Sequence, residues 1–447
     1  MAKIAKLSRL IEGAAEKFKD DRTTGGLITY NRLKKLNQCV MLTVTGNPDT
    51  NDADIFRYDP ALLEALEVDP EGGGLASQPT IVRFLNNITK EELDALADWL
   101  LEFYVRQHDS NPRRIYLYAD GTAVETYGKQ EGTAYRGGKY KKEMYFPLLI
   151  FDQDGWLLTA KLRRGYESEA KTIQAELEKI VAKLRQRWRN VEIVLVVDSA
   201  FKSSGLLTWC EKNKVFYLAG YTNTFAIQSK LKEDRSQVEK VFKKRHGKPR
   251  FTGKHWKQDV QEEHERIRDI EDPKERMREE KAFAARCTRL IGEDTHKATT
   301  WPKEDPERRF VFRIDYTDTG FDTRCLLTNF TCYTADQLYE MYCQRGTSEQ
   351  WIGELKHCLR FNSQRFRANQ FRLFIHGLAY MLLWLLRSSC SAGFHRWSLQ
   401  TIRKVFVQIP VAATFKSSRT TLWELTDRYQ HQTELLRLVR KLEARAS

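Results

Sequence analysis

The residues best suited to chemistry share one predicted helix, over residues 335–358. Tyr342, Arg345, Glu349 and Lys356 stand at offsets of 0, 3, 7 and 14 along it. Because each residue turns an α-helix by about 100°, the four side chains fall within an arc of about 60°. Two cations and a hydroxyl suit a phosphate backbone, but the carboxylate beside them would repel phosphate unless a metal ion lay between. The spacing therefore indicates a metal-assisted site for a phosphodiester.

Two glycines, Gly346 and Gly353, fall on the same stripe of this helix. A glycine costs a helix interior about 1 kcal/mol relative to alanine. Its missing Cβ atom lets a large ligand, such as a nucleic-acid backbone, approach the helix closely. The alternative interpretation is a plain surface helix, in which Arg345 and Glu349 form an i, i+4 ion pair worth about 0.2–0.5 kcal/mol.

Two aspartates stand at the ends of predicted strands far upstream of Glu349. Asp120 closes the run RIYLYAD (114–120), and Asp198 closes VEIVLVVD (191–198). Ligands of α/β sheets bind at the carboxyl ends of strands. Three carboxylates form the all-oxygen ligand set that Mg²⁺ prefers, and two ions about 3.5–4 Å apart would activate a water or a 3′-hydroxyl for an in-line displacement. Taken singly, each aspartate is as easily a turn former or a helix N-cap.

The elements that would position these carboxylates follow an informative order. Three predicted strands, a helix, a strand, a helix and a strand occupy residues 114–120, 143–152, 155–164, 167–189, 191–198, 204–213 and 214–221. This is the order of a ribonuclease-H-like α/β fold, a mixed five-stranded sheet with flanking helices whose first and fourth strands are neighbours. Further strands are predicted at 309–316 and 323–330, and further helices near 256–293 and at 335–358, 368–389 and 420–444.

The pattern divides the chain into five parts. A mostly helical part is predicted over 1–110, where Thr89 and Glu92 form a helix start of capping-box type. The other parts are 111–222 (first part of the α/β core), 223–309 (an insertion), 310–390 (rest of the core, with the glutamate helix) and 391–447 (a C-terminal helical region).

The net charge of the 447-residue chain is +14, and it is concentrated in two stretches. From Glu349 to the C-terminus there are 16 Lys and Arg against 6 Asp and Glu, and residues 229–258 hold 11 against 3. Such clusters are typical of a nucleic-acid partner, although a pair of solvated basic faces is the alternative. Within the C-terminal cluster, Arg365, Arg367 and Arg372 are the best additional candidates for phosphate contacts.

Composition excludes several classes of protein. A hydrophobic fraction of 41% excludes a mainly disordered chain. The longest apolar stretch, between Arg372 and Arg387, has 14 residues, whereas a membrane-spanning helix needs about 20. The first residues, MAKIAKLSRLIEGAAEKF, contain no apolar signal region. Eight cysteines without a C-x-x-C pair favour neither a zinc site nor disulfides. We therefore expect a soluble cytoplasmic protein with a core helix at 373–386.

At this point the sequence resembles a known family. The motif Tyr342-x2-Arg345-x3-Glu349-x6-Lys356 is similar to the signature of DDE transposases in the superfamily of insertion sequence family 4, which includes the transposon five enzyme. The segments that most resemble insertion sequence family 1380 are YCQRGTSEQWIGELK (342–356), VVDSAFKSSGLLTWCEKNKVFYLAG (196–220), YADGTAVETYGKQEG (118–132) and LASQPTIVRF (75–84).

The resemblance implies a catalytic centre. Asp120, Asp198 and Glu349 would form a DDE triad that binds two Mg²⁺ ions, for which Mn²⁺ can substitute. It also implies a ribonuclease-H-like core interrupted by an insertion between the second Asp and the Glu, which agrees with the division at 223–309.

The resemblance implies partners as well. Tyr342, Arg345 and Lys356 would contact DNA phosphates near the cleavage point. The substrate would be double-stranded DNA, as transposon terminal inverted repeats and target, bound by a homodimer in a synaptic complex at the bacterial nucleoid. In related enzymes an insertion-domain tryptophan can hold a flipped base. Trp256 and Trp301 are candidates, although a tryptophan in such a position is more often a core residue.

The predicted function is therefore cut-and-paste DNA transposition, with Mg²⁺-dependent cleavage at the ends followed by strand transfer. One alternative is a metal-dependent DNA nuclease of the same fold that joins no strands. The other is a captured transposase that only binds DNA. An intact set of three carboxylates argues against the second alternative, because a protein that only binds DNA gains nothing from groups that repel phosphate.

Overall fold

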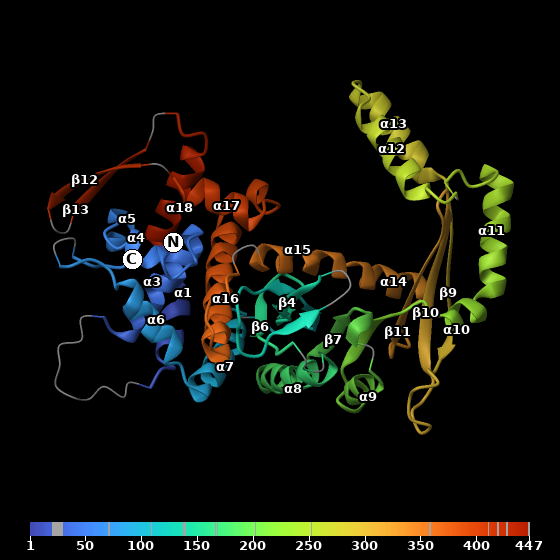
Figure 1. Cartoon of the computed structure of the whole chain (residues 1–447), viewed down its shortest axis with the longest axis horizontal. Helices are drawn as coiled ribbons and strands as arrows, with labels where there is room; N and C mark the ends of the chain where they lie inside the picture. The colour runs from blue at the N-terminus through green and yellow to red at the C-terminus, as the bar shows by residue number, and fades with distance from the viewer. Residues whose placement is uncertain are drawn as a thin grey trace. The chain divides into compact units, whose positions relative to one another are not determined.

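The structure is a computed structural model of the chain (Figure 1). It describes residues 1–19, 30–69, 72–108, 110–136, 140–165, 167, 169–201, 203–251, 253–356, 359–409, 411–417, 420–425 and 428–445. The chain divides into two compact units. Unit 1 consists of Met1–Val191 and Thr347–Ser447, and unit 2 consists of Glu192–Gly346.

The first part of unit 1 is helical, as the apolar periodicity of the sequence predicts. Its helices are α1 (Ala2–Ser8), α2 (Leu10–Ala15), α3 (Arg32–Thr45), α4 (Asp52–Ile55), α5 (Pro60–Ala65), α6 (Gln78–Asn86) and α7 (Lys90–Arg106). The capping box predicted at Thr89 and Glu92 is confirmed. Glu92 N donates to the Thr89 hydroxyl at 3.1 Å, and Thr89 N donates to the Glu92 carboxylate at 3.0 Å. Such a cap stabilises a helix by about 1 kcal/mol.

The strands predicted at 114–120 and 155–164 are present in unit 1. β5 (Leu148–Phe151) pairs antiparallel with β1 (Arg114–Gly121) on one side and with β6 (Leu157–Lys161) on the other. The turn between β5 and β6 contains Gly155 at φ +88°, a backbone conformation that favours glycine. The helix predicted next is α8 (Glu169–Arg187).

A small separate sheet follows β1. Its strand order is β2 (Val124–Glu125), β4 (Lys142–Tyr145), β3 (Ala134–Arg136). The single strand predicted over 143–152 is therefore wrong, because it is divided between β4 and β5. Pro147 lies at the division, and proline has no N–H group to donate to a ladder.

The C-terminal part of unit 1 surrounds one long buried helix, α16 (Phe366–Ser389). This is the core helix that the apolar stretch predicts, and Figure 1 shows it running beside β6 and the N-terminal helices. The elements around it are α15 (Arg345–Lys356), η2 (Ala392–Phe394), α17 (Leu399–Phe406), β12 (Val411–Ser417), β13 (Thr420–Leu425) and α18 (Gln432–Ala444). The helix predicted over 420–444 is wrong at its start, because 420–425 pairs with β12. Among the described helices, none has the length and apolarity that crossing a membrane requires.

Unit 2 contains a mixed sheet with the strand order β7-β8-β11-β10-β9. Its strands are β7 (Glu192–Val197), β8 (Phe216–Tyr221), β9 (Cys287–His296), β10 (Arg308–Thr317) and β11 (Gly320–Thr328). β7 and β8 are parallel, and the other pairs are antiparallel. Its helices are η1 (Ser199–Phe201), α9 (Ser204–Lys212), α10 (Phe225–Lys230), α11 (Lys232–His246), α12 (Trp256–Arg268), α13 (Pro273–Ala285) and α14 (Ala335–Cys343).

The mixed α/β character predicted from the element order is confirmed. The strands predicted at 309–316 and 323–330 are present as β10 and β11, although the expected five-stranded sheet did not include them, and β9 was not predicted as a strand. The helix predicted near 256–293 is also wrong in part. It is two helices, α12 and α13, followed by β9. Asp272 caps the start of α13 through Lys274 N at 2.9 Å, which breaks the helical run, and Cys287–His296 pairs with β10 along its length. Polar composition concealed this strand, because its exposed residues follow no clear alternation.

Candidate active site

Asp120 lies in β1, the strand of unit 1 that ends at Gly121. Its Oδ1 accepts a hydrogen bond from Gly121 N at 2.7 Å. A Cβ atom on Gly121 would lie 2.9 Å from Nη2 of Arg163. Arg163 is 1% exposed, and its Nε donates to Phe146 O at 2.7 Å. A buried guanidinium therefore stands beside the backbone that carries Asp120. Sequence reasoning missed Arg163, whose only signal was its position near the end of the strand predicted over 155–164.

Glu349 lies on α15, and this helix packs against β1. Trp351 of α15 is 5% exposed. Its ring contacts Tyr118 of β1 at 6.0 Å and Phe151 of β5 at 5.9 Å, measured between ring centroids. Tyr118 precedes Asp120 by two residues. Packing of Trp351 thus places the helix of Glu349 on the strand of Asp120.

The outer face of α15 carries the predicted stripe. Glu349 and Lys356 are exposed. Cβ atoms built on Gly346 and Gly353 would meet no atom within 4 Å. The buried residues of the helix are Ser348, Trp351, Ile352 and Leu355. Open space over both glycines is what close approach of a ligand to this helix requires.

The prediction of one helix over 335–358 is wrong, because two helices form. α14 ends at Cys343, and Gln344 separates it from α15 although its φ of −61° and ψ of −17° are helical. The boundary between the units follows Gly346. Glycine has a low helix propensity, so Gly346 weakens the helix close to the break between α14 and α15. Tyr342 lies on α14, so the 60° arc does not extend over the whole motif.

In unit 2 the second aspartate meets the motif tyrosine. Asp198 follows β7, and its Oδ1 accepts from Ala200 N at 2.9 Å at the start of η1. A Cβ atom on Gly220 of β8 would lie 2.4 Å from the Tyr342 hydroxyl oxygen and 3.3 Å from the carbonyl carbon of Asp198. Because Gly220 has no side chain, the Tyr342 hydroxyl can lie beside the Asp198 backbone.

The capping interpretation of Asp198 is confirmed, and its role as a metal ligand stays a prediction. Its Oδ1 does cap η1, as the bland alternative predicts. Within the described part of unit 2, no hydrogen bond involves Oδ2. One carboxylate oxygen is therefore committed to the fold, and the other can serve a ligand.

The predicted site residues are divided between the units. Asp120 and Glu349 lie on packed elements of unit 1, whereas Asp198, Tyr342 and Arg345 belong to unit 2. Over the ranges that the structure describes, no three His, Cys, Asp or Glu side chains gather closely enough to hold a metal ion. As a donor set, three carboxylates fit a hard divalent cation. A complete set needs residues of both units.

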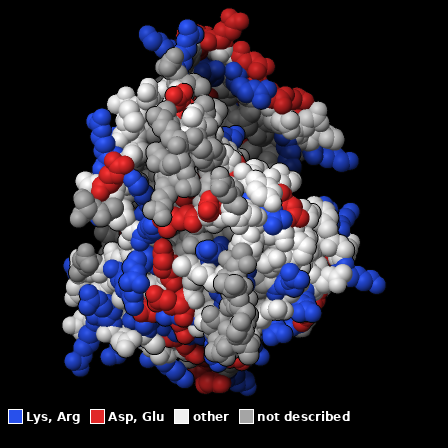
Figure 2. Space-filling view, turned by 90° about the vertical axis from the view of Figure 1, so that its left-hand side faces the viewer, with Lys and Arg blue, Asp and Glu red and all other residues white. Residues whose placement is uncertain are grey.

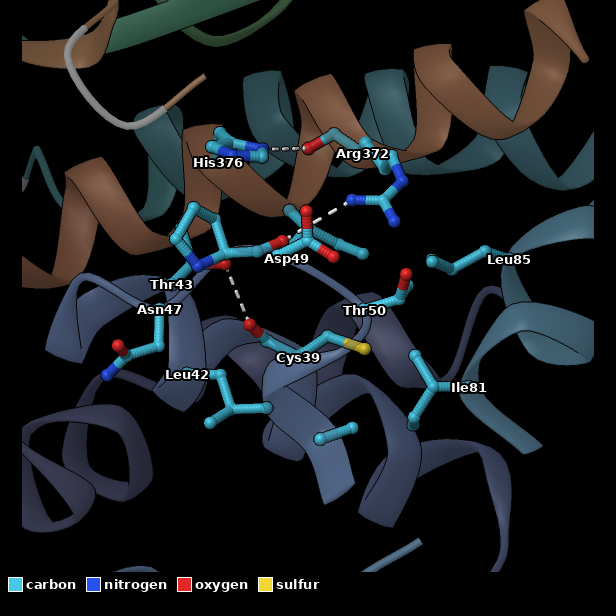
Figure 3. Close-up of a pocket in the computed structure, with 13 residues that line it drawn as sticks. Cys39, Leu42, Thr43, Asn47, Asp49, Thr50, Ile81, Leu85, Arg372 and His376 are labelled. Atoms are coloured by element: carbon cyan, nitrogen blue, oxygen red, sulfur yellow. Dashed lines mark hydrogen bonds between the residues drawn. The ribbon is translucent and has the colours of Figure 1, made fainter. Parts of the chain in front are cut away.

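The three additional arginines differ in exposure. Arg365 and Arg367 are exposed at the start of α16, and Nη1 of Arg365 donates to Asn86 O at 3.2 Å. Arg372 is 4% exposed, and burial lowers its pKa. Figure 3 shows it pointing from α16 toward the loop between α3 and α4, where its Nη1 donates to Pro48 O at 3.4 Å. The structure does not present this guanidinium to solvent, and the phosphate contact of Arg372 stays a prediction.

Positive charge is spread over separate patches on the face in Figure 2. Lys and Arg side chains gather in groups there, and a band of Asp and Glu runs between two of them. The basic stretch 229–258 lies in unit 2, where the last turn of α11 carries Lys243, Lys244 and Arg245. Patches of this kind suit several local contacts along a polyanion.

The two candidate tryptophans lie in different surroundings. The Trp301 ring packs 6.3 Å from both Tyr221 and His296, and the guanidinium of Arg308 lies 5.0 Å from its centroid. Burial lowers the pKa of His296 in this group. Trp256 stands at the start of α12 and is 37% exposed. Of the two, Trp256 presents the more accessible ring.

One comparison with known proteins shows the family of this chain. Residues 1–447 match the family described as transposase DDE domain group 1. Two solved structures are similar at a distance. A piggyBac transposase synaptic complex with hairpin DNA has 11% identity and a TM-score of 0.45, over 90% of this chain and 76% of that one. A Mos1 transposase paired-end complex with a left transposon end has 13% identity and a TM-score of 0.16, over 43% and 60%. No curated protein matches. Because the family match spans the whole sequence, the chain belongs to the DDE transposases of domain group 1.

Proposed function

We propose that this transposase cleaves DNA at the terminal inverted repeats of an insertion sequence of family 1380 and joins the freed 3′ end to target DNA. Asp120, Asp198 and Glu349 are the proposed ligands of two Mg²⁺ ions, for which Mn²⁺ can substitute. When bound, such ions supply Lewis acidity to a phosphodiester. The runner-up is a metal-dependent nuclease of the same family that does not join strands.

One observation carries this proposal: the motif tyrosine and the second aspartate meet. The space at Gly220 admits the Tyr342 hydroxyl beside the Asp198 backbone. These residues are 144 positions apart in the sequence. The position of the Tyr342 hydroxyl beside the Asp198 backbone is not needed to cap η1, because Asp198 Oδ1 does so. In unit 1, the packing of Trp351 supports the proposal in the same way, because it joins the helix of Glu349 to the strand of Asp120.

The cationic residues have the proposed role of holding DNA phosphates. Arg345 and Lys356 flank Glu349 on α15, and the open space over Gly353 leaves room for a backbone strand between them. Arg365, the residue that precedes α16, is exposed and is a further proposed phosphate contact. A guanidinium is suited to this task because it can donate two parallel hydrogen bonds to one phosphate.

The proposal extends to the organisation of the chain. Residues 111–222 and 310–390 are the proposed ribonuclease-H-like core, 223–309 the insertion domain, and 1–110 and 391–447 the proposed DNA-contact or dimerisation regions. A homodimer would hold two transposon ends, in the bacterial cytoplasm and in association with the nucleoid. Of the proposed triad, Asp198 belongs to unit 2, and Asp120 and Glu349 belong to unit 1.

Strand transfer with pre-cleaved ends tests the proposal. The wild-type protein, end DNA with a free 3′-hydroxyl, plasmid and Mg²⁺ should yield joined product, and Asp198→Ala should yield none while still binding the DNA. Asp98→Ala is the matched control, because Asp98 is exposed on α7, away from the proposed triad. Cleavage of uncut ends without any joined product would identify the nuclease instead.

A further inference from the structure

A fully buried arginine lies against the end of the strand that carries Asp120. Arg163 is 1% exposed and follows Leu162, just beyond β6. Burying a guanidinium costs free energy unless its N–H groups have hydrogen-bond partners. An apolar side chain would fill this place at lower cost. The arginine therefore indicates a requirement that apolar packing does not meet.

The backbone that carries Arg163 is fixed to the long helix α16. Gln370 Oε1 of α16 accepts from Leu162 N at 2.7 Å, and Gln370 Nε2 donates to Ala160 O at 3.0 Å. One amide side chain thus holds the end of β6 by both a donor and an acceptor. Because Leu162 directly precedes Arg163, the guanidinium extends from a backbone that is itself well anchored.

The guanidinium joins the segment before β5 to the end of β1. Arg163 Nε donates to Phe146 O at 2.7 Å. The next carbonyl oxygen, that of Pro147, accepts from Thr122 N at 3.1 Å. A Cβ atom on Gly121 would lie only 2.9 Å from Arg163 Nη2, which is closer than real Cβ contacts come. Because Gly121 has no side chain, the guanidinium can lie directly against β1.

This contact is on the face of β1 opposite the Asp120 carboxylate. Asp120 and Gly121 pair with Leu149 and Leu148 of β5, so both belong to the strand ladder. Side chains alternate between the two faces of a strand. A Cβ atom on Gly121 consequently points away from the Asp120 carboxylate. Arg163 therefore supports the strand from behind.

The orientation of the Asp120 carboxylate depends on the same peptide group. Its Oδ1 accepts a hydrogen bond from Gly121 N at 2.7 Å. A shift of the Gly121 peptide would therefore move the carboxylate with it. In metal sites, loss of a group that orients a ligand typically costs about 10–100-fold in metal affinity or activity.

We propose that Arg163 is a positioning residue, which holds the Gly121 peptide and thereby the Asp120 carboxylate in the orientation that a metal ligand requires. The planar guanidinium suits this task because its N–H groups point in fixed directions and can brace two backbone segments at once. Gly121 belongs to the same arrangement, because a larger residue there would displace the guanidinium. The inference rests on the proposed function, since it takes Asp120 as a metal ligand.

Binding of Mn²⁺ to the full chain without DNA, followed by electron paramagnetic resonance, tests this role independently of cleavage. Arg163→Gln and Gly121→Ala should each weaken Mn²⁺ binding by about 10–100-fold. Arg163→Lys keeps the charge but lacks the planar fork, so it should bind Mn²⁺ as weakly as Arg163→Gln. Gly121→Ala leaves the buried arginine in place and tests the same contact if Arg163→Gln does not fold. Wild-type Mn²⁺ affinity in Gly121→Ala, or in folded Arg163→Gln, would overturn the proposal.

The double variant Arg163→Gln, Gly121→Ala shows whether the two residues act through their contact. Glutamine is shorter than arginine, so it leaves room for the added methyl group. The double variant should therefore bind Mn²⁺ no more weakly than Arg163→Gln alone. Losses that multiply would mean that the two residues act independently, and they would overturn the proposed contact.

Trp188→Leu is the control for a general loss of stability. Trp188 is 3% exposed and packs against Tyr104, which in turn contacts Trp156 at the turn between β5 and β6. This turn is at the opposite end of β5 from Leu148, the partner of Gly121. Trp188→Leu should lower the midpoint of urea unfolding and bind Mn²⁺ as wild type does. A loss of Mn²⁺ affinity as large as that of the arginine variants would show destabilisation in place of positioning.

Asp120→Asn separates this inference from the proposed function. It should weaken Mn²⁺ binding, because it removes a proposed ligand. If it does so while the Arg163 and Gly121 variants bind Mn²⁺ normally, the positioning role is overturned and the proposed function stands. If Asp120→Asn itself binds Mn²⁺ normally, Asp120 is not a ligand and both are overturned.

Discussion

Gly220 is the residue on which the meeting of Tyr342 and Asp198 depends. Gly220→Ala places a methyl group 2.4 Å from the Tyr342 hydroxyl oxygen, so the tyrosine must move. Overpacking of this kind costs about 1–3 kcal/mol of stability, and a displacement of about 1 Å at a reacting centre can cost about 10²-fold in rate. We expect cleavage of end DNA to fall by one to two orders of magnitude, in single-turnover assays.

The matched control is Gly205→Ala, in the first turn of α9, where a Cβ atom would meet nothing within 4 Å. It should cleave at the wild-type rate. Equal rates for Gly220→Ala and Gly205→Ala would show that the tyrosine contact has no part in the reaction.

At the residue scale, the sequence predicted candidate residues for the chemistry but not their surroundings. Spacing was enough to select Asp120, Asp198 and Glu349, because strand ends and helix stripes are local features. Spacing did not predict that Arg372 is buried while Arg365, seven residues earlier, is exposed. That difference arises from the loop between α3 and α4, which covers α16 and is distant in sequence. Arg163 was missed for the same reason.

At the element scale, α15 is held in place by two residues of its second half. Trp351 anchors it to β1, and Glu354 anchors it to α16 and α17. The Glu354 carboxylate accepts from Arg387 Nη1 at 3.2 Å and from Leu399 N at 3.0 Å. The side chains of Glu354 and Arg387 are 6% and 9% exposed. This buried ion pair supports the helix that carries Glu349.

Glu354→Gln should destabilise the protein by about 3–5 kcal/mol, because it leaves the buried Arg387 charge without a counter-charge. Urea unfolding followed by circular dichroism measures the change. The double variant Glu354→Leu, Arg387→Met removes both charges and should recover most of the loss. A single variant within about 0.5 kcal/mol of wild type would contradict the anchoring role of this pair.

Element prediction succeeded where periodicity was strong and failed where pairing decided the outcome. The helices near the N-terminus and α16 follow their apolar spacing. β9 and β13 were expected to be helical, but their polar sequences form strands because β10 and β12 pair with them. The division of 143–152 follows from Pro147, a signal that was visible in the sequence.

At the scale of the whole molecule, the +14 charge gives a testable dependence on salt. Each phosphate contact contributes a slope of about −0.9 to a plot of log affinity against log salt concentration. The double variant Arg365→Ala, Arg367→Ala should therefore flatten the slope for end DNA by about 2, in fluorescence anisotropy titrations. Arg268→Ala is the control, because Arg268 is paired with Asp269 on the surface of α12. A slope that is unchanged in the double variant would remove these arginines from the DNA path.

The division into two units is the property that the sequence did not predict. A division between core and insertion at 223 and 309 follows composition, whereas the units separate at Val191 and Gly346. Because β9, β10 and β11 add to β8, the segment that the sequence assigns to an insertion shares a sheet with β7 and β8 in unit 2. The consequence is that Asp198 belongs to a different unit from Asp120 and Glu349.

The most direct test of the central claim is Mg²⁺-dependent cleavage by three isosteric variants, Asp120→Asn, Asp198→Asn and Glu349→Gln. Each removes one charge and keeps the side-chain shape, so DNA binding without metal should persist. If the three carboxylates form one metal-dependent site, each variant should cleave labelled end DNA about 10³-fold more slowly or worse, since several kcal/mol of stabilisation are lost. Cleavage at the wild-type rate by any one of them would contradict the proposed triad.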